Sequence, residues 1–248
     1  MTHVRPLLDA EGTFATFREA FGVDDDGPWN LPFFAFLVET GGVTVVVDTG
    51  VGPPGGADPF LPERQGRLPA ELAAAGVAPP DVDLVVLTHL HVDHVGWTMA
   101  GGRPFFPNAR YVVHRDDFEW ITATRPERPY VRENVVALQA TGRLELVDGP
   151  AEPSPGVRVI RIGGHTPGHC IVDVGEVTLL GDLAVHPHQL ADPDLAYVAE
   201  EDPAATASAR RRLLSGFAAS GRVVGLGHLG LGRVKRRDDG FGWSPLLD

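Results

Sequence analysis

The chain has 248 residues, of which 43% are hydrophobic, and its 33 acidic against 21 basic residues give a formal net charge of −12. This length supports one large α/β domain with a substantial core, and no linker-like stretch divides it, so we expect a single domain over residues 1–248. A strongly negative field repels phosphate backbones, which argues against nucleic acid as a general partner.

The single cysteine, Cys170, excludes an internal disulfide bond and fits the cytoplasm, which is the location that we expect. The N-terminal residues contain no long apolar segment, so a signal peptide is not expected. No run approaches the roughly 18 apolar residues of a membrane-spanning helix, so no membrane partner is expected.

The first half of the chain predicts strands that run into polar residues. Apolar segments at 33–39 and 43–47 flank Thr40-Gly41-Gly42, which predicts a tight hairpin. The second strand leads into Asp48-Thr49-Gly50, and a loop rich in proline and glycine is expected from Gly50 to about Pro62. Five elements follow in chain order: a helix over 69–75, a strand over 84–87, a strand over 111–113, and helices over 115–122 and about 130–140.

The second half again predicts strands followed by a helix. A strand over 157–162 leads into Gly163-Gly164-His165-Thr166-Pro167-Gly168-His169. Strands over 170–174 and 177–180 are expected to form a hairpin about Gly175-Glu176, and a strand over 222–226 is expected to end at Gly227-His228. Asp202 as N-cap and Gly221 beyond the end predict a helix over 203–219, and we interpret Arg210-Arg211-Arg212 on it as a solvated face. Both halves read as strands followed by helices, which allows a pseudo-symmetric pair of αβ layers.

Residues 88–94 read Thr-His-Leu-His-Val-Asp-His and directly follow the buried-strand pattern of residues 83–87. Burying so many imidazole and carboxylate groups is costly unless a cation holds them together. The end of a core strand is also where α/β proteins usually place their chemistry. The motif therefore predicts a metal site, with four candidate ligands: His89, His91, Asp93 and His94.

Three further candidates lie next to predicted strands, namely His169, Asp182 and His228. Imidazole and carboxylate without thiolate suit zinc and also tolerate manganese, iron or cobalt. Seven ligands are too many for one tetrahedral ion but suit two ions that share a carboxylate. We therefore expect two divalent metal ions, with zinc as the expected metal.

The order His-x-His-x-Asp-His, Thr-Pro-Gly-His, Gly-Asp and Gly-His resembles the metallo-β-lactamase-fold hydrolase superfamily, over residues 48–228. The resemblance implies an α/β fold, a four-layer αββα sandwich of two mixed sheets flanked by helices, with the site at one edge of the sheets. It also implies how the ligands divide: His89, His91 and His169 hold one ion, Asp93, His94 and His228 hold the other, and Asp182 bridges them.

The resemblance also implies roles for residues around the ions. Asp93 is the expected catalytic residue, because its free oxygen would orient the nucleophile or pass a proton to the leaving group. Asp48 would support the site from behind. His186 is a candidate pocket residue, whereas we leave His165 out of the ligand set as a structural histidine. A vestigial site is disfavoured, because a decayed site would be expected to lose ligands and none is missing.

The function that the resemblance implies is a dinuclear metal-dependent hydrolase, in which a metal-bridging hydroxide attacks a small ester, lactone or phosphotriester. The stretches Gly-Asp-Leu-Ala-Val-His-Pro and Phe-Pro-Asn-Ala-Arg-Tyr are similar to the lactonase and organophosphate-hydrolase-like branch. Lactonases of this family commonly carry a tyrosine three residues after the bridging aspartate, and Val185 at that position weakens the assignment.

Three alternatives stay open: a glyoxalase II-like thioester hydrolase, a mononuclear iron sulfur dioxygenase of the same fold, and a non-catalytic binding protein on this scaffold. The complete second ligand set argues against the dioxygenase. We expect a small, neutral or weakly charged substrate, and a homodimer is left open. Aromatic residues near the motifs are candidates for apolar pocket walls: Phe33, Phe34, Trp97, Phe105 and Phe106.

Overall fold

The computed structural model describes residues 2–54 and 65–246. Its first sheet has six strands in the order β1-β2-β3-β4-β7-β8. Strands β3, β4, β7 and β8 run parallel to one another, so their carboxyl ends lie at the same edge of the sheet. The strands have these bounds: β1 His3–Thr16, β2 Pro28–Thr40, β3 Val43–Val47, β4 Leu84–Val86, β7 Arg110–His114 and β8 Leu144–Val147.

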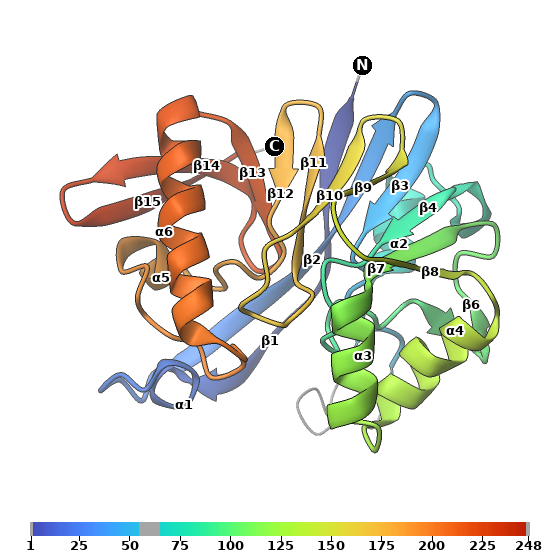
Figure 1. Cartoon of the computed structure of the whole chain (residues 1–248), viewed down its shortest axis with the longest axis horizontal. Helices are drawn as coiled ribbons and strands as arrows, with labels where there is room; N and C mark the ends of the chain where they lie inside the picture. Colours follow the sequence, from blue (N-terminus) through green and yellow to red (C-terminus); the bar gives the residue numbers. More distant parts are fainter. Residues whose placement is uncertain (1, 55–64, 247–248) are drawn as a thin grey trace.

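The second sheet has seven strands in the order β15-β14-β13-β12-β11-β10-β9. Strands β12 and β13 are parallel and end at the same edge as β3 and β4, the lower edge in Figure 1. A separate two-stranded sheet pairs β5 Met99–Ala100 with β6 Arg103–Pro104. The strands of the second sheet have these bounds: β9 Ala151–Ser154, β10 Val157–Arg161, β11 Cys170–Val174, β12 Val177–Leu179, β13 Val223–Leu226, β14 Gly230–Arg237 and β15 Gly240–Pro245.

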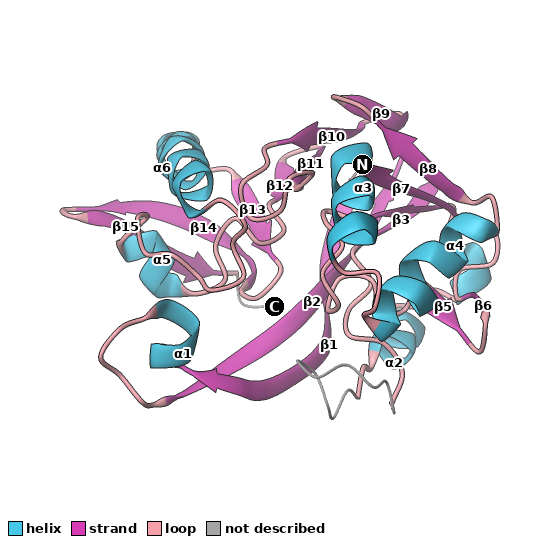
Figure 2. Ribbon diagram, turned by 60° about the horizontal axis from the view of Figure 1, so that its bottom comes forward, coloured by secondary structure: helices cyan, strands magenta, loops and turns pink. Residues whose placement is uncertain are grey.

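Helices cover the outer faces of both sheets (Figures 1 and 2). Helices α2, α3 and α4 lie on the six-stranded sheet, and α5 and α6 on the seven-stranded sheet. No helix in the described part of the chain is long and apolar enough to span a membrane. The helical segments have these bounds: α1 Phe17–Phe21, α2 Leu68–Ala74, the 3₁₀ turn Pro79–Asp81, α3 Arg115–Thr124, the π-helical turn Val131–Val136, α4 Ala137–Ala140, α5 Pro187–Ala191 and α6 Pro203–Ser220.

The core strands are buried on both faces, which explains their continuous apolar runs. Val45 and Val47 of β3 face the second sheet, whereas Val46 between them faces the helices. Strand β4 alternates in the same way, with Leu84 turned inward and Val85 outward. The four-layer αββα sandwich expected from the sequence is therefore confirmed.

The structure also corrects and extends the element predictions. The strands β1, β5, β6, β8, β9, β14 and β15, the short helices α1 and α5 and the 3₁₀ turn were not predicted. The predicted helix over 130–140 begins with a π-helical turn. Helix α6 has the expected N-cap, because the Asp202 side chain accepts a hydrogen bond from the Ala205 backbone N–H, and it ends at Gly221 in the left-handed region. The predicted loop from Gly50 to about Pro62 lies partly outside the described residues.

The prediction of a solvated arginine face on α6 is wrong for its first residue. Arg210 is fully buried and forms an ion pair with buried Glu200, whereas Arg211 and Arg212 are exposed. The Arg210 guanidinium also donates to three backbone carbonyls, those of Leu183, Pro193 and Leu195.

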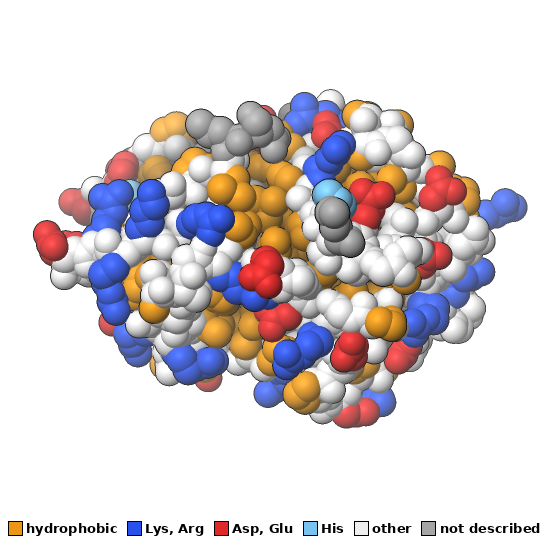
Figure 3. Space-filling view, turned by 90° about the horizontal axis from the view of Figure 1, so that it is seen from above, with side chains coloured by type: hydrophobic (Ala, Val, Ile, Leu, Met, Phe, Trp, Pro, Cys, Tyr) orange, Lys and Arg blue, Asp and Glu red, His pale blue; other side chains and the backbone are white. Residues whose placement is uncertain are grey.

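Hydrophobic side chains gather at the centre of the upper face of the molecule, with charged side chains around them (Figure 3). This face carries the hairpin turns at the opposite ends of the strands from the polar motifs. The candidate site therefore lies at the lower edge of the sandwich.

Candidate metal centre

The first group of histidines lies between two loops, the loop that follows β4 and the loop that connects β10 to β11. The Nε2 atom of His89 lies 3.1 Å from Nδ1 of His91, and that Nδ1 atom lies 3.0 Å from Nε2 of His165. All three side chains are buried, and one nitrogen from each lies within 4.8 Å of the others. We call these three residues the first group.

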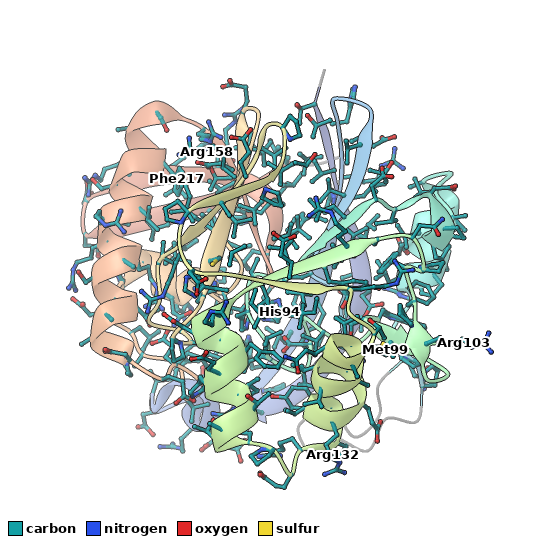
Figure 4. The ribbon with its side chains drawn as sticks, turned by 45° about the vertical axis from the view of Figure 1, so that its right-hand side comes forward. His94, Met99, Arg103, Arg132, Arg158 and Phe217 are labelled. Atoms are coloured by element: carbon teal, nitrogen blue, oxygen red, sulfur yellow. The ribbon has the colours of Figure 1, made fainter. Side chains whose placement is uncertain are left out.

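A second group lies beside it and combines imidazole with carboxylate. The Nε2 atom of His94 lies 3.5 Å from Oδ2 of Asp93. The Nε2 atom of His228 lies 3.4 Å from the same Asp93 oxygen. Figure 4 shows His94 in the middle of the molecule, away from surface residues such as Arg103. The second group has four members: Asp93, His94, Asp182 and His228.

Asp182 faces both groups. Its Oδ2 atom lies 3.5 Å from Nε2 of His165 and 3.9 Å from Nε2 of His89. The same oxygen lies 3.1 Å from Nε2 of His228, and Oδ1 lies 3.3 Å from Nε2 of His94. The two groups are therefore adjacent and share one carboxylate, as expected for a bridging ligand.

The structure does not bring His169 into either group. Its Nε2 atom accepts a hydrogen bond from the backbone N–H of Asp182, at 3.2 Å. The Thr166-Pro167-Gly168 turn separates the two histidines of this loop, and His165 reaches the first group instead. The sequence signal is ambiguous here, because this loop contains the pair Gly-His twice, at 164–165 and at 168–169. The pair alone does not say which histidine points into the site.

Several buried polar atoms of the two groups have no hydrogen-bond partner among the described residues. They include Nε2 of His94 and Oδ1 of Asp182, and Nδ1 of His169, whose ring lies 5.3 Å from that of His89, lacks one as well. Buried polar groups without partners are costly, so such a cluster calls for a ligand that satisfies them together. Imidazole nitrogens and carboxylate oxygens are ligands that divalent zinc accepts, and the residues present fit two cations.

The electrostatics of the two groups differ. Burial lowers the pKa of His89 and His165 well below the usual range and that of His91 to about 4, which leaves these imidazoles neutral, the form that binds metal. In the second group burial also opposes the charged form, but the carboxylates of Asp182 and Asp93 raise the pKa of His94 well above its ordinary value. The second group therefore attracts positive charge.

Asp48 lies behind the second group at the end of β3. Its carboxylate accepts hydrogen bonds from the backbone N–H and the hydroxyl of Thr88, both at 2.8 Å. Its Oδ2 atom also lies 2.9 Å from Nδ1 of His94. If Nδ1 donates to Asp48, Nε2 of His94 is left to face the site. This is the supporting geometry expected from the sequence, and its functional role stays a prediction.

His186 lies outside both groups, in a set of aromatic rings that was not foreseen. Its ring centroid is 5.1 Å from that of Phe17 and 6.4 Å from that of Trp29. Tyr197 joins this set to the first group, because its ring lies parallel to that of His165, with a 6.3 Å centroid separation. The residues that form the set come from distant segments, so no local pattern predicts it.

Four of the five candidate pocket aromatics divide between the site and the core, and the fifth, Phe34, is partly buried and packs against the core between the two sheets. The ring of Phe33 lies 5.3 Å from that of His228, so Phe33 borders the second group. Trp97 packs against Phe105, and Phe106 is fully buried, so these three belong to the core that supports the site.

Comparison with known proteins agrees with this architecture. The family model described as Metallo-beta-lactamase superfamily matches residues 31–224. The N-acyl homoserine lactonase AiiB of Agrobacterium fabrum (strain C58 / ATCC 33970) is 32% identical over 162 residues, which are 56% of each chain. An N-acyl homoserine lactonase of Bacillus cereus is 28% identical over 155 residues, with 56% of this chain and 57% of the relative covered. The chain thus aligns with about half the length of these curated relatives.

Solved structures share the fold over the whole chain. The hydrolase AbOPH, described as in the beta lactamase superfamily, has a TM-score of 0.85 at 24% identity and covers 100% of this chain and 95% of its own. The dizinc quorum-quenching lactonase AidC has a TM-score of 0.82 at 20% identity, with the same coverage. The order of motifs, the layered fold and the family match over residues 31–224 lead to one conclusion: the chain belongs to the metallo-β-lactamase superfamily.

Proposed function

We propose that the protein is a dinuclear metal-dependent hydrolase that opens the ring of small lactones. The observation that carries this proposal is the pair of adjacent ligand groups that share Asp182. The relatives named N-acyl homoserine lactonases favour a lactone over other esters. The complete second group argues against a mononuclear dioxygenase.

In the proposed centre the first group would hold one ion, and His165 would take the place that the sequence analysis gave to His169. Asp93, His94 and His228 would hold the second ion, and Asp182 would serve both. Two bound divalent ions, with zinc the expected metal, would supply a nucleophile derived from water at neutral pH and polarise the carbonyl oxygen of the substrate. Asp48 would keep the ring of His94 in its ligating orientation.

Asp93 is suited to the proton transfers. Its side chain is 13% exposed, whereas the other members of the two groups are buried, so Asp93 faces the space that a substrate enters. Lactone hydrolysis adds a water oxygen to the carbonyl carbon and breaks the ring C–O bond, and the ring oxygen must then take a proton. In this proposal the Asp93 carboxylate orients the water, accepts the proton that the water loses, and passes it to the ring oxygen, which leaves as the hydroxyl group of the product.

The substrate is expected to be small and neutral or to carry a single negative charge, because the chain has a net charge of −12. The apolar rings of Phe33 and Tyr197 beside the two groups favour a substrate with an apolar part. Val185, at the position where related lactonases commonly carry tyrosine, is buried and supplies no polar group. A cytoplasmic location stays a prediction, supported by the single, buried, free Cys170.

A substrate panel tests the proposed reaction. Metal-loaded protein is assayed on acyl lactones of several chain lengths, aryl esters, a glutathione thioester, a phosphotriester and RNA. We expect kcat/KM to be highest for a lactone. Preference for the thioester or the phosphotriester would contradict the lactone proposal, and turnover of RNA alone would contradict the expectation of a small substrate.

Asp93→Asn is expected to reduce kcat for lactone hydrolysis by about 10²–10⁴-fold, the usual contribution of a general acid or base. The fold should be spared, because Asp93 lies in a loop and not in the core. The measurement is kcat at saturating metal, together with the urea midpoint of unfolding. Asp239→Asn, an exposed change in the β14–β15 turn, serves as control. Turnover of Asp93→Asn close to that of the control would show that this carboxylate moves no proton.

A further inference from the structure

Asp117 is a buried carboxylate whose hydrogen bonds lead to two separate loops. It lies in the first turn of α3 and is fully buried, and no salt bridge to it occurs among the described residues. Its Oδ2 atom accepts a hydrogen bond from the backbone N–H of Leu90 at 2.7 Å. Its Oδ1 atom accepts one from the backbone N–H of Gly168 at 2.9 Å.

The two donors belong to the loops that carry the first group. Leu90 stands between His89 and His91, in the loop after β4 of the six-stranded sheet. Gly168 stands three residues after His165, in the loop between β10 and β11 of the seven-stranded sheet. One carboxylate on α3 therefore ties together the loops of two different sheets, directly behind the ligands that these loops present.

The close packing of the loop against α3 explains why residue 168 is a glycine. A Cβ atom at Gly168 would lie 2.4 Å from the backbone nitrogen of Asp117 and 2.6 Å from its Cβ atom. The loop can approach α3 closely enough for the hydrogen bond only because residue 168 has no side chain. The Thr-Pro-Gly-His motif thus has a role in packing as well as in supplying a histidine.

Helix capping does not account for the position of Asp117. The N-cap of α3 is His114, whose side chain accepts from the backbone N–H of Asp116. Asp117 instead directs both oxygens to other segments, and burial raises its pKa to about 6. Burying a carboxylate costs free energy. Such a residue is retained where its hydrogen bonds hold segments in place that an apolar side chain could not hold.

We propose that Asp117 is a positioning residue that sets the spacing between the loop of His89 and His91 and the loop of His165, and so tunes the affinity of the first metal site. The proposal rests on the dinuclear centre proposed above. Asp117 touches neither substrate nor ion. An Asn in its place keeps the size but presents an NH₂ group to one of the two backbone donors, which removes that hydrogen bond.

The test is a Zn²⁺ titration of metal-free protein in competition with a chromogenic chelator, which resolves the two binding constants. For Asp117→Asn we expect the affinity for one of the two equivalents to fall by about 10–100-fold, the usual effect of losing a supporting contact, while the other stays unchanged. Asp116→Asn, at the half-exposed neighbour on the same helix turn, should leave both constants as in the wild type.

A second variant covers the case in which Asp117→Asn does not fold. Gly168→Ala keeps the carboxylate but pushes the loop away from α3, and it should weaken the same single equivalent. Unchanged binding in both variants, or an equal loss at both sites, would overturn the positioning role. If the wild type itself binds no Zn²⁺, the dinuclear function fails and this inference fails with it, whereas two tight sites with unaffected variants refute the inference alone.

Discussion

Asp182→Asn is expected to reduce lactone turnover by about 10³-fold or more and to weaken the binding of both metal ions. The carboxylate lies within 3.9 Å of nitrogen atoms from four histidines, two in each group, so it joins the two groups. Loss of a shared ligand removes several kcal/mol of charge stabilisation in the transition state, and each 1.36 kcal/mol corresponds to about tenfold in rate. The measurements are kcat/KM at saturating Zn²⁺ and the number of Zn²⁺ ions retained after gel filtration.

Asp238→Asn, on the exposed β14–β15 turn, controls for the loss of one negative charge. The control should retain two ions and wild-type turnover. Retention of two tightly bound ions by Asp182→Asn would contradict the bridging role, even if activity were lost.

Arg210→Ala is expected to destabilise the folded protein by about 3–5 kcal/mol, the range measured when one partner of a buried ion pair is removed. The change leaves the buried Glu200 carboxylate without its cation and three backbone carbonyls without their donor. Urea unfolding of the metal-loaded protein, followed by circular dichroism, measures the free energy of unfolding.

Arg211→Ala provides a matched control, because this neighbouring arginine is exposed and pairs with Asp194, which is exposed as well. Its effect should stay below about 1 kcal/mol, as is usual for surface ion pairs. Equal effects of the two substitutions would show that the buried pair contributes no more than a surface pair. Arg210→Ala also removes a hydrogen bond close to the site, because the Arg210 guanidinium donates to the backbone carbonyl of Leu183, the residue after Asp182.

Local patterns were sufficient to predict the strands that present the site. The runs before Asp48, His89 and His228 are apolar and short, and each is a strand in the structure that ends at the predicted edge. Strand β1 was missed because its 14 residues do not alternate regularly. It has irregular pairing between Leu8 and Ala10 and contains the buried Asp9, whose carboxylate holds the backbone of Val51 and Leu68.

Features that depend on contacts between distant segments could not be read from the sequence. His165 and His169 both follow a glycine, and only the fold of the loop shows which one faces His91. Arg210 looks like its exposed neighbours in the sequence, and its burial depends on Glu200 in another segment. Asp117 resembles any acidic residue in the first turn of a helix until its two partners are known.

A titration of metal-free protein with Zn²⁺, with hydrolysis of an acyl lactone recorded at each step, tests the central claim most directly. If two adjacent ligand groups share Asp182 and act together, activity should rise until two equivalents are bound and then level off. Full activity at one equivalent, or no lactone hydrolysis at two, would contradict the proposed dinuclear lactone hydrolase.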